Sequence, residues 1–505
     1  MIVLIHPPVV KPSEPPAGIA RLAGALRDHE VACTLVDANL EGLCYLLARV
    51  QPAADTWSQR AHRHLDRHLK SLRASELYVR PDAYRRAVAD VERLLGQCGP
   101  EGVRPGLADY RDGRWSPVRS ADLRAAAHQP ERNPFYSYYM EGLLPRLAAV
   151  CPSVVGISIN YLSQALCAFA LIGVLRRARP GLKIMLGGGL ITSWMQRPGR
   201  IDSLADLVDQ VAAGPGEEPL LQAAGRHLSH GDGAPDYSQL RALPYLSPGF
   251  ILPFSASAGC WWRRCAFCPE RAERRPFQPL PHRRAAAQLR QLTEQTRPVL
   301  IHLLDNALSP GLLQALCCQP PGAPWYGFVR IAPPLDDADF CMRLATAGCV
   351  MLKIGLESGN QAVLDRLDKG VRLEMAARVL ANLRRAGIAA YVYLLFGTPA
   401  EDEAAARDTL AFVAEHAATI GFLNLAIFNL PLGSPDAAGL ALRDFYDGDL
   451  ALYRDFEHPS GWDRAKVRRF VERVFKKHPL VQPIVRRDPP LFTSNHAAFF
   501  IAPVR

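Results

Sequence analysis

The chain has 505 residues, of which 49% are hydrophobic, 21% charged and 8% aromatic. This composition is ordinary for a globular protein and excludes a chain that is mainly disordered, collagenous or coiled-coil. The length suggests about three domains. Lysine and arginine number 59 against 49 for aspartate and glutamate, a net charge of +10, and so mild an excess is weak evidence for nucleic-acid binding by itself.

Cysteine content and apolar segments indicate the compartment. Twelve cysteines are too few for a disulfide scaffold in a chain of this length. The first residues lack the basic region and long apolar core of a signal peptide. The longest apolar stretch, near residues 166–175, is far shorter than the ~20 residues that cross a bilayer. We therefore expect a soluble protein of the reducing cytoplasm with no membrane partner.

The first segment, residues 1–235, has the pattern of a doubly wound sheet. Strand-like runs alternate with helical spacing, which predicts a parallel sheet covered by helices on both faces. Ligands of such sheets bind outside the carboxyl ends of the strands. We expect strands at residues 2–6, 31–37, 153–159, 182–186 and 207–213, and helices at residues 18–27 and 164–177.

An insertion at about residues 41–140 interrupts this pattern and is rich in arginine and histidine. Helices are expected at residues 55–73 and 81–95, followed by a polar loop. His62, His64 and His68 would share one helix face, and histidine is a common metal ligand. A solvated basic face is the simpler interpretation of the three histidines.

The second segment, residues 236–436, repeats a strand–helix unit. Six such units predict a full or partial parallel barrel with its site at the carboxyl ends of the strands. A small mixed extension, residues 437–505, follows, with helical spacing at residues 462–477 and an extended end at residues 491–502. The barrel strands are expected at residues 251–257, 299–304, 325–330, 349–357, 390–396 and 421–428, and the helices at residues 282–296, 310–317, 336–347, 360–386 and 401–416.

Three cysteines follow directly after the first strand of this second segment: Cys260, Cys265 and Cys268. Thiolates are soft ligands that suit zinc and iron–sulfur clusters. A closed zinc site needs four ligands, and no fourth lies nearby in the sequence. Three thiolates on a cubane cluster instead leave one iron open for chemistry. We therefore favour an iron–sulfur cluster, with a zinc knuckle that borrows a distant ligand as the alternative.

The cysteine cluster, with Phe267 before its last cysteine, resembles the signature of radical S-adenosylmethionine (SAM) enzymes, in the branch that carries a cobalamin-binding domain. The family pattern has three residues between the first two cysteines, and this chain has four. Further motifs match in order at the ends of the following strands. The resemblance implies that SAM is bound by Phe267, Asp305, Arg330, Glu357, Ser358, Gly397 and Pro399.

The first segment resembles the cobalamin-binding domain of the same branch. The Asp-x-His-x-x-Gly motif that gives cobalt a histidine is absent, so the resemblance implies a cobalamin without that ligand. A domain that binds no corrin and only covers the barrel is the alternative. The implied cobalamin contacts are the strand-end residues Pro7, Asp37, Asn39, Ser158, Asn160, Gly187, Gly188, Gly214, Gly216 and Glu217.

The activity that the resemblance implies begins with a 4Fe–4S cluster that reductively cleaves SAM to a 5′-deoxyadenosyl radical. It also implies a flavodoxin- or ferredoxin-type electron donor and a small-molecule or peptide substrate. Methylation of an unactivated carbon through cobalamin is the favoured outcome. Rearrangement, cyclisation or oxidation without methyl transfer is the alternative. A zinc-stabilised nucleic-acid-binding protein is a third hypothesis, although the chain carries no nucleic-acid module signature.

Overall fold

The computed structural model describes the chain except residues 197–198, 200, 228–232, 491–495 and 502–505. It divides into two compact units. The first unit comprises Met1–Phe250 together with Tyr446–Leu452, and the second unit is formed chiefly by Ile251–Phe445 and Tyr453–Pro489. Residues of the C-terminal extension therefore belong to both units.

The first unit is built on a five-stranded parallel sheet with the strand order β2-β1-β5-β6-β7. Its interior strand β1 is apolar on both faces, and the side chains from Ile2 to Ile5 are at most 1% exposed. A strand covered on both sides needs such a continuous apolar run. The doubly wound sheet predicted from the sequence is confirmed. The strands are β1 (Ile2–His6), β2 (Cys33–Asp37), β5 (Val154–Ser158), β6 (Lys183–Gly187) and β7 (Gln210–Val211).

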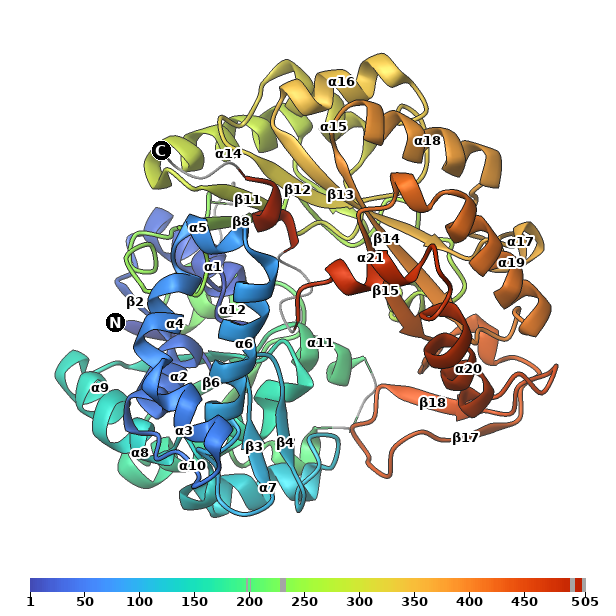
Figure 1. Ribbon diagram of the computed structural model, residues 1–505. Coiled ribbons are helices and arrows are strands. Elements are labelled where there is room, and N and C mark those ends of the chain that lie inside the picture. The colour runs from blue at the N-terminus through green and yellow to red at the C-terminus, as the bar shows by residue number, and fades with distance from the viewer. Residues whose placement is uncertain (197–198, 200, 228–232, 491–495, 502–505) are drawn as a thin grey trace. The chain divides into compact units, whose positions relative to one another are not determined.

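Helices cover this sheet, and one of them is buried on nearly all sides (Figure 1). Helix α10 (Leu162–Ala178) has no exposed residue between Gln164 and Leu175, because it packs against both the sheet and α7 (Ser120–His128). A Cβ on Gly173 would lie 1.8 Å from the carbonyl oxygen of Ala127, so only glycine allows the two helices to approach this closely. The other covering helices are α1 (Ala17–Asp28), α2 (Ala38–Arg49), α11 (Gly189–Met195) and α12 (Glu217–Ala223).

The insertion is more structured than its sequence predicts. The helix at residues 81–95 is confirmed as α6 (Pro81–Leu95), but the helix expected at residues 55–73 is broken into α3 (Thr56–Arg63) and α4 (Leu65–Leu72). The expected polar loop is wrong: it holds α7 and a hairpin of β3 (Val103–Pro105) and β4 (Tyr110–Asp112). Tertiary packing on α10, which local polarity cannot reveal, stabilises these elements.

Of the three histidines of the insertion, His64 and His68 lie with their ring centres 6.0 Å apart. His68 is buried, with Nε2 3.0 Å from Asp90 Oδ2. Within the part of the chain that the structure describes, no group of three histidine, cysteine, aspartate or glutamate side chains could hold a single metal ion. His68 therefore serves as a packing and hydrogen-bonding residue between α4 and α6.

The second unit is built on a six-stranded parallel sheet with the order β15-β14-β13-β12-β11-β8 (Figure 1). The strand order follows the chain from β8 to β15 without closing, which confirms the partial barrel. The strands are β8 (Ile251–Phe254), β11 (Leu300–Leu303), β12 (Trp325–Val329), β13 (Cys349–Glu357), β14 (Ala389–Phe396) and β15 (Phe422–Ile427), and the helices between them are α14 (His282–Thr296), α15 (Pro310–Cys318), α16 (Ala338–Thr346), α17 (Gln361–Arg366), α18 (Leu373–Arg385) and α19 (Glu403–Glu415).

The single helix expected at residues 360–386 is wrong, because the chain leaves the helix between α17 and α18. Asp368 and Gly370 adopt positive φ angles of 49° and 65° there. Left-handed backbone ends an α-helix. The resulting turn, residues 367–372, lies next to the loop that carries the three cysteines, residues 259–268, which we call the cysteine loop. This turn is part of the site described below.

The amino ends of the barrel strands form one apolar layer. A short helix, His496–Phe500, packs on this layer through Ala497, which is fully buried. The expectation of an extended end at residues 491–502 is therefore wrong for residues 496–500, and residues 491–495 and 502 lie outside the described residues. The layer contains Ile251, Leu300, Tyr326, Met351, Tyr391 and Phe422.

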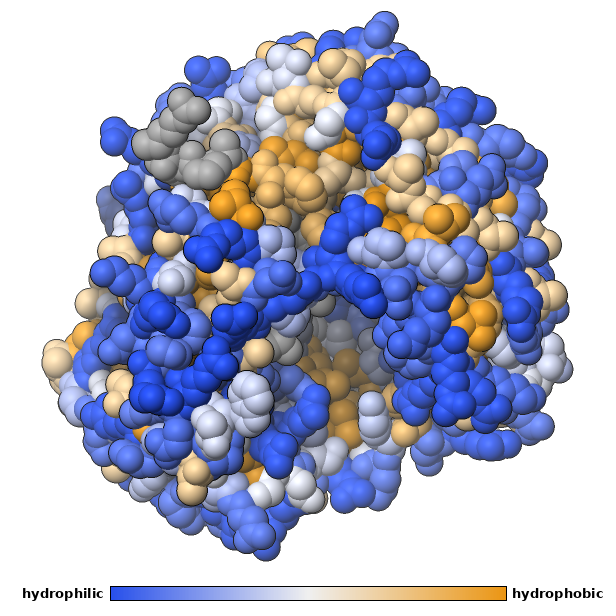
Figure 2. Space-filling view, in the orientation of Figure 1, coloured by the Kyte–Doolittle hydropathy of each residue, from blue (hydrophilic) through white to orange (hydrophobic). Residues whose placement is uncertain are grey.

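The extension adds smaller elements to the second unit: β16 (Leu430–Pro431), β17 (Leu442–Asp444), β18 (Tyr453–Phe456), α20 (Arg464–Phe470) and α21 (Gln482–Arg487). Strands β16, β18 and β17 form an antiparallel sheet. None of the helices described is long and apolar enough to cross a membrane. On the face shown in Figure 2, hydrophilic residues predominate and apolar ones gather in a few patches.

Candidate functional site

The cysteine loop starts where β8 ends, and its path depends on two glycines. Gly259 has a φ of 72°, and a Cβ there would lie 2.3 Å from the carbonyl oxygen of Pro276. Gly370 has a φ of 65°, and its Cβ would lie 2.2 Å from Trp262 Cζ2. Glycine is the residue that tolerates both the backbone angle and the close approach. The four residues between the first two cysteines are thus accommodated by seating Trp262 on Gly370.

The cysteines of the loop lie around the guanidinium of Arg330, which follows β12. Arg330 Nη1 donates to Cys265 Sγ over 3.5 Å, and Arg330 Nη2 donates to the carbonyl of Lys369. Cys260 is near enough to interact electrostatically with Arg330, and Cys265 interacts in the same way with Cys268. The structure therefore brings the three predicted cysteines and the predicted Arg330 to one place.

Burial makes two of these thiols, Cys265 and Cys268, harder to ionise. It raises the pKa of Cys265, while the nearby cations Lys369 and Arg330 act in the opposite direction. It also raises the pKa of Cys268 to about 11. Such thiols ionise when a metal takes the place of their protons, and the surrounding cations then offset the negative charge of a thiolate-bound cluster.

These residues fit an iron–sulfur cluster better than a single ion. No three potential ligands converge on one point among the described residues, as a mononuclear zinc site would need. A cubane cluster instead holds each thiolate on a different iron atom, so its ligands stand further apart. Three half-buried or buried cysteines with two cations beside them match that requirement.

An ion pair lies at the carboxyl end of β13. Lys369 Nζ is 2.7 Å from Glu357 Oε1, and the two side chains are only 6% and 12% exposed. Gly355 leaves the space for this pair, because a Cβ there would come within 2.6 Å of Glu357 Oε1 and 2.8 Å of Lys369 Nζ. Lys369 Nζ also lies 5.4 Å from the centre of the Phe267 ring. Lys369 thus contacts both Glu357 and Phe267, beside the cysteines.

Two further predicted SAM ligands make contacts within the protein. Asp305 accepts hydrogen bonds from Ala256 N at 3.0 Å and from Ser257 Oγ, and burial raises its pKa. It therefore braces the chain just before the cysteine loop. Ser358 is fully buried, 3.2 Å from Thr409 Oγ1 of α19. Ser358 points into the helix layer, so its side chain positions the backbone after β13.

The fifth-strand turn is held by a buried carboxylate. Gly397 has a φ of 79° and donates its N–H to Glu401 Oε2, which also accepts from Trp462 Nε1 at 3.1 Å. Burial raises the pKa of Glu401 to about 7. The half-buried Pro399 lies in the same turn. Glu401 therefore fixes the turn that carries Gly397 and Pro399, two of the residues to which the resemblance assigns SAM binding.

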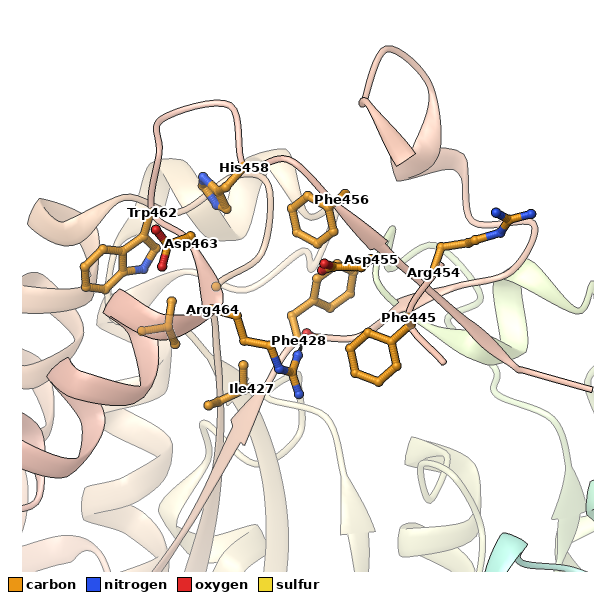
Figure 3. Close-up of a pocket in the computed structure, with 12 residues that line it drawn as sticks. Ile427, Phe428, Phe445, Arg454, Asp455, Phe456, His458, Trp462, Asp463 and Arg464 are labelled. Carbon is orange, nitrogen blue, oxygen red and sulfur yellow. Dashed lines mark hydrogen bonds between the residues drawn. The ribbon is translucent and has the colours of Figure 1, made fainter. Parts of the chain in front are cut away.

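A pocket opens beside this turn, at the carboxyl end of β15 (Figure 3). Arg464 reaches between Phe428 and Phe445: its Nη1 donates to the carbonyl of Phe428 over 3.0 Å, and its guanidinium carbon is 4.9 Å from the Phe445 ring centre. Gly397 lines the same pocket. The pocket is lined by aromatic rings together with both cationic and anionic side chains, among them Arg464 and Asp463.

The predicted cobalamin residues occupy the carboxyl edge of the sheet in the first unit, and several already have protein partners. Asn39 exchanges hydrogen bonds with Val10, 2.8 Å to its Oδ1 and 2.9 Å from its Nδ2. Asp37 accepts from Leu40 N and from Tyr245 OH, and burial raises its pKa to about 6. The carbonyl of Pro7 accepts from Gln164 Nε2 at 2.7 Å. These three residues hold the edge in shape.

The remaining residues of this edge form the turns after β5, β6 and β7. Asn160 Oδ1 accepts from Gly189 N at 2.9 Å, and Asn160 Nδ2 donates to Ser158 Oγ at 3.2 Å. Gly188, with a φ of 107°, would collide with the Ile159 carbonyl if it had a Cβ. Glu217 is paired with Arg21 at 2.6 Å.

Two glycines of this edge leave open space around the backbone. A Cβ added to Gly187 would meet no described atom closer than 3.7 Å, and one added to Gly214 would meet none within 4 Å. These two turns can therefore approach a bound group closely, whereas the turn at Gly188 is filled by the protein itself.

His6 stands at the end of β1 on the same edge. It is buried, its Nδ1 has no hydrogen-bond partner among the described residues, and burial lowers its pKa to about 4. The imidazole is therefore neutral at physiological pH. Sequence patterns alone assign no role to this side chain.

Sequence patterns assign no individual role to several other residues of the site. Lys369, Gly370 and Glu401 stand out only as parts of motifs, and Arg464 does not stand out at all. The signal for Lys369 is its place twelve residues after Glu357 in a motif with a glycine. The signals for Glu401 and Arg464 lie in contacts with Gly397 and Phe428, which no local pattern encodes.

Comparison with known proteins agrees with this geometry. Residues 254–413 match the family model of the Radical SAM superfamily, and the match spans β8 to most of α19. No curated protein matches the chain in sequence.

Solved structures with a similar fold include the enzymes OxsB and TsrM. OxsB, a cobalamin-dependent SAM radical enzyme solved with aqua-cobalamin and SAM, gives a TM-score of 0.51 at 14% identity over 84% of this chain. This chain spans 53% of the length of OxsB. TsrM from Kitasatospora setae, a radical SAM methyltransferase solved with cobalamin and a 4Fe–4S cluster, gives 0.51 at 15% identity over 88% of this chain and 77% of TsrM. At such identities the likeness is one of fold.

Proposed function

Residues 254–413 belong to the radical SAM superfamily, and from this premise we propose that the chain is a SAM-cleaving radical enzyme that uses cobalamin to methylate an unactivated carbon of a small molecule or peptide. The observation that carries the proposal is the assembly of Cys260, Cys265 and Cys268 around Arg330 at the carboxyl end of the barrel strands. Lys369 and Glu357 lie beside them.

In this proposal the three thiolates hold a 4Fe–4S cluster with one iron left to SAM. When bound, the cluster supplies one electron to the sulfonium of SAM, whose C–S bond breaks to give methionine and the 5′-deoxyadenosyl radical. The protein supplies orientation and electrostatics. Arg330 and Lys369 offset the charge of the thiolates, and the buried position of Cys265 excludes water, which protects a radical from quenching.

The residues beyond the cluster shape the place for SAM. Glu357 and Lys369 present opposite charges at the end of β13, and they suit the amino and carboxylate groups of an amino-acid ligand. Glu401 holds the turn at Gly397, beside the pocket walled by Phe428 and Arg464. We place the adenine of SAM against this turn.

The cobalamin part of the proposal rests on the first unit. Its parallel sheet ends in an edge where Gly187 and Gly214 leave open space, and open backbone at the carboxyl ends of such strands accepts large ligands. His6, the buried imidazole there, is neutral. OxsB and TsrM, whose fold this chain shares, were both solved with cobalamin.

A second candidate is a radical SAM enzyme of another outcome, such as cyclisation or oxidation, whose first unit binds no corrin. The observation that favours it is the engagement of Asp37, Asn39 and Glu217 with protein partners. These side chains are then structural. In both candidates we place the chain in the reducing cytoplasm with a flavodoxin- or ferredoxin-type donor, because reductive cleavage of SAM needs an external electron.

Anaerobic purification and reconstitution test the proposal. We expect about four iron and four sulfide per chain, 5′-deoxyadenosine from SAM and a reductant, and one tightly held cobalamin with S-adenosylhomocysteine as a further product. The variant in which all three cysteines of the loop become alanine should lose iron and both products while keeping cobalamin. Iron and 5′-deoxyadenosine without cobalamin would favour the second candidate. A colourless protein with one zinc would contradict both.

A further inference from the structure

A buried hydrogen-bond donor lies next to the first cysteine. The indole Nε1 of Trp261 is buried and has no hydrogen-bond partner among the described residues. An indole N–H can only donate. Leaving such a donor unsatisfied costs about 1–3 kcal/mol, and a buried group of this kind requires an explanation. Trp261 follows Cys260 directly, within the stretch that is one residue longer than the family pattern.

The neighbouring Trp262 is in a different situation. Its Nε1 donates to the carbonyl of Asp368 over 3.1 Å, and its ring rests on Gly370. Arg264, whose Nη2 is 2.8 Å from Asp368 Oδ1, holds the same segment. Trp262 therefore attaches the loop to the turn after α17, and its ring meets that of Trp261 edge-on with centres 6.1 Å apart.

Trp261 lies beside the same guanidinium that contacts a cysteine sulfur. The guanidinium carbon of Arg330 lies 5.7 Å from the Trp261 ring centre and 4.1 Å from that of Trp262, and Arg330 Nη1 donates to Cys265 Sγ. The Nε of Arg330 is a second buried donor without a partner in the described part of the chain. Trp261 Nε1 and Arg330 Nε are therefore two buried donors that have no acceptor among the described residues. Sulfide and thiolate sulfur are acceptors that a cluster would bring to this place.

We propose that Trp261 is a positioning and tuning residue that donates a hydrogen bond from its indole to a sulfur atom of the iron–sulfur cluster. The inference rests on the proposed function, because it needs a cluster on Cys260, Cys265 and Cys268. A donor to sulfur stabilises the reduced, more negative cluster, so it raises the reduction potential. Trp261 thereby makes the cluster easier to reduce before SAM is cleaved.

The test compares W261F with W262F in the full chain after anaerobic reconstitution. Phenylalanine keeps an aromatic ring and removes the N–H. Midpoint potentials are measured by redox titration followed by electron paramagnetic resonance, without SAM. We expect W261F to retain the iron and sulfide of the wild type and to show a more negative potential. W262F, which loses a bond to the Asp368 carbonyl, should keep the wild-type potential.

A second measurement detects the proposed hydrogen bond in the wild type and uses the two variants to assign it. Tryptophan labelled with ¹⁵N in the indole should give a nitrogen coupling to the reduced cluster in pulsed spectra of the wild type, which is lost in W261F and kept in W262F. An unshifted potential in W261F, an equal shift in W262F or no ¹⁵N coupling in the wild type would overturn the inference. These results leave a cluster in place, whereas failure of the proposed function would leave none.

Discussion

The buried ion pair at the end of β13 offers a quantitative test of the site. Replacing Lys369 by methionine keeps the length of the side chain and removes its charge. Glu357 is left 12% exposed without the ammonium that lies 2.7 Å from its Oε1. Removing one partner of a buried pair costs about 3–5 kcal/mol, because the remaining charge stays buried. K369M should therefore destabilise the carboxyl end of β13 by about that amount.

Hydrogen exchange at the amides of β13 and β14 measures this effect locally, which is preferable because a chain with two compact units is not expected to unfold in one step. A loss of about 3–5 kcal/mol corresponds to opening that is roughly 100- to 4,000-fold more frequent. The double variant E357Q/K369M removes the stranded charge as well, and its exchange should return most of the way to the wild type.

Arg372→Met is the matched control. Arg372 and Glu374 form an exposed pair 3.8 Å apart, with side chains 64% and 70% exposed, and such a pair contributes about 0–1 kcal/mol. R372M should therefore change exchange by less than about tenfold. If K369M behaves like R372M, or if the double variant is no more protected than K369M, the reasoning about this pair is wrong.

Three further changes test other parts of the account. Burial raises the pKa of Glu401 from 4.5 to about 7, so ionisation of this carboxyl destabilises the folded state. The free energy of unfolding should therefore fall by about 3 kcal/mol as the pH rises from 4.5 to 7. Unfolding measured against pH should show no such loss in E401Q, and an equal pH profile in the variant would contradict this reasoning. Gly370→Ala should displace Trp262 and lower the iron bound after reconstitution; full iron content would argue against the seating of that ring. Gly187→Leu should weaken cobalamin binding, measured by retained corrin, with an unchanged circular dichroism spectrum; undiminished corrin would remove Gly187 from the site.

Local patterns were sufficient for some of the regular elements. Strand β1 and the helices α6 and α14 begin and end where the sequence predicts, because their apolar spacing is continuous and ends at proline, glycine or polar residues. The parallel character of both sheets also follows from the alternation of strands and helices.

Contacts between distant residues were not predictable in this way. The break between α17 and α18 depends on Trp262, which docks on Gly370 from more than a hundred residues away in the sequence. The same is true of α7, whose helix is stabilised by α10. These elements form because of partners that a single stretch of sequence does not contain.

In the candidate site, too, local patterns predicted some features, whereas others depend on contacts between distant residues. The three cysteines and Arg330 were named from their spacing and strand positions, and the structure brings them together. The resemblance also named Ser358 and Asp305, but in the structure Ser358 bonds toward Thr409 and Asp305 toward Ala256. A motif identifies the type of residue at a strand end, whereas the side-chain direction is decided by its neighbours.

The central claim is that three thiolates hold a cluster whose fourth iron is open to SAM. Mössbauer spectroscopy of the chain reconstituted with ⁵⁷Fe tests it directly. The account predicts a 4Fe–4S cluster in which one of the four iron subsites changes its parameters when SAM is added, while the other three do not. Four subsites that are unaffected by SAM, or iron bound without a cubane signature, would contradict it.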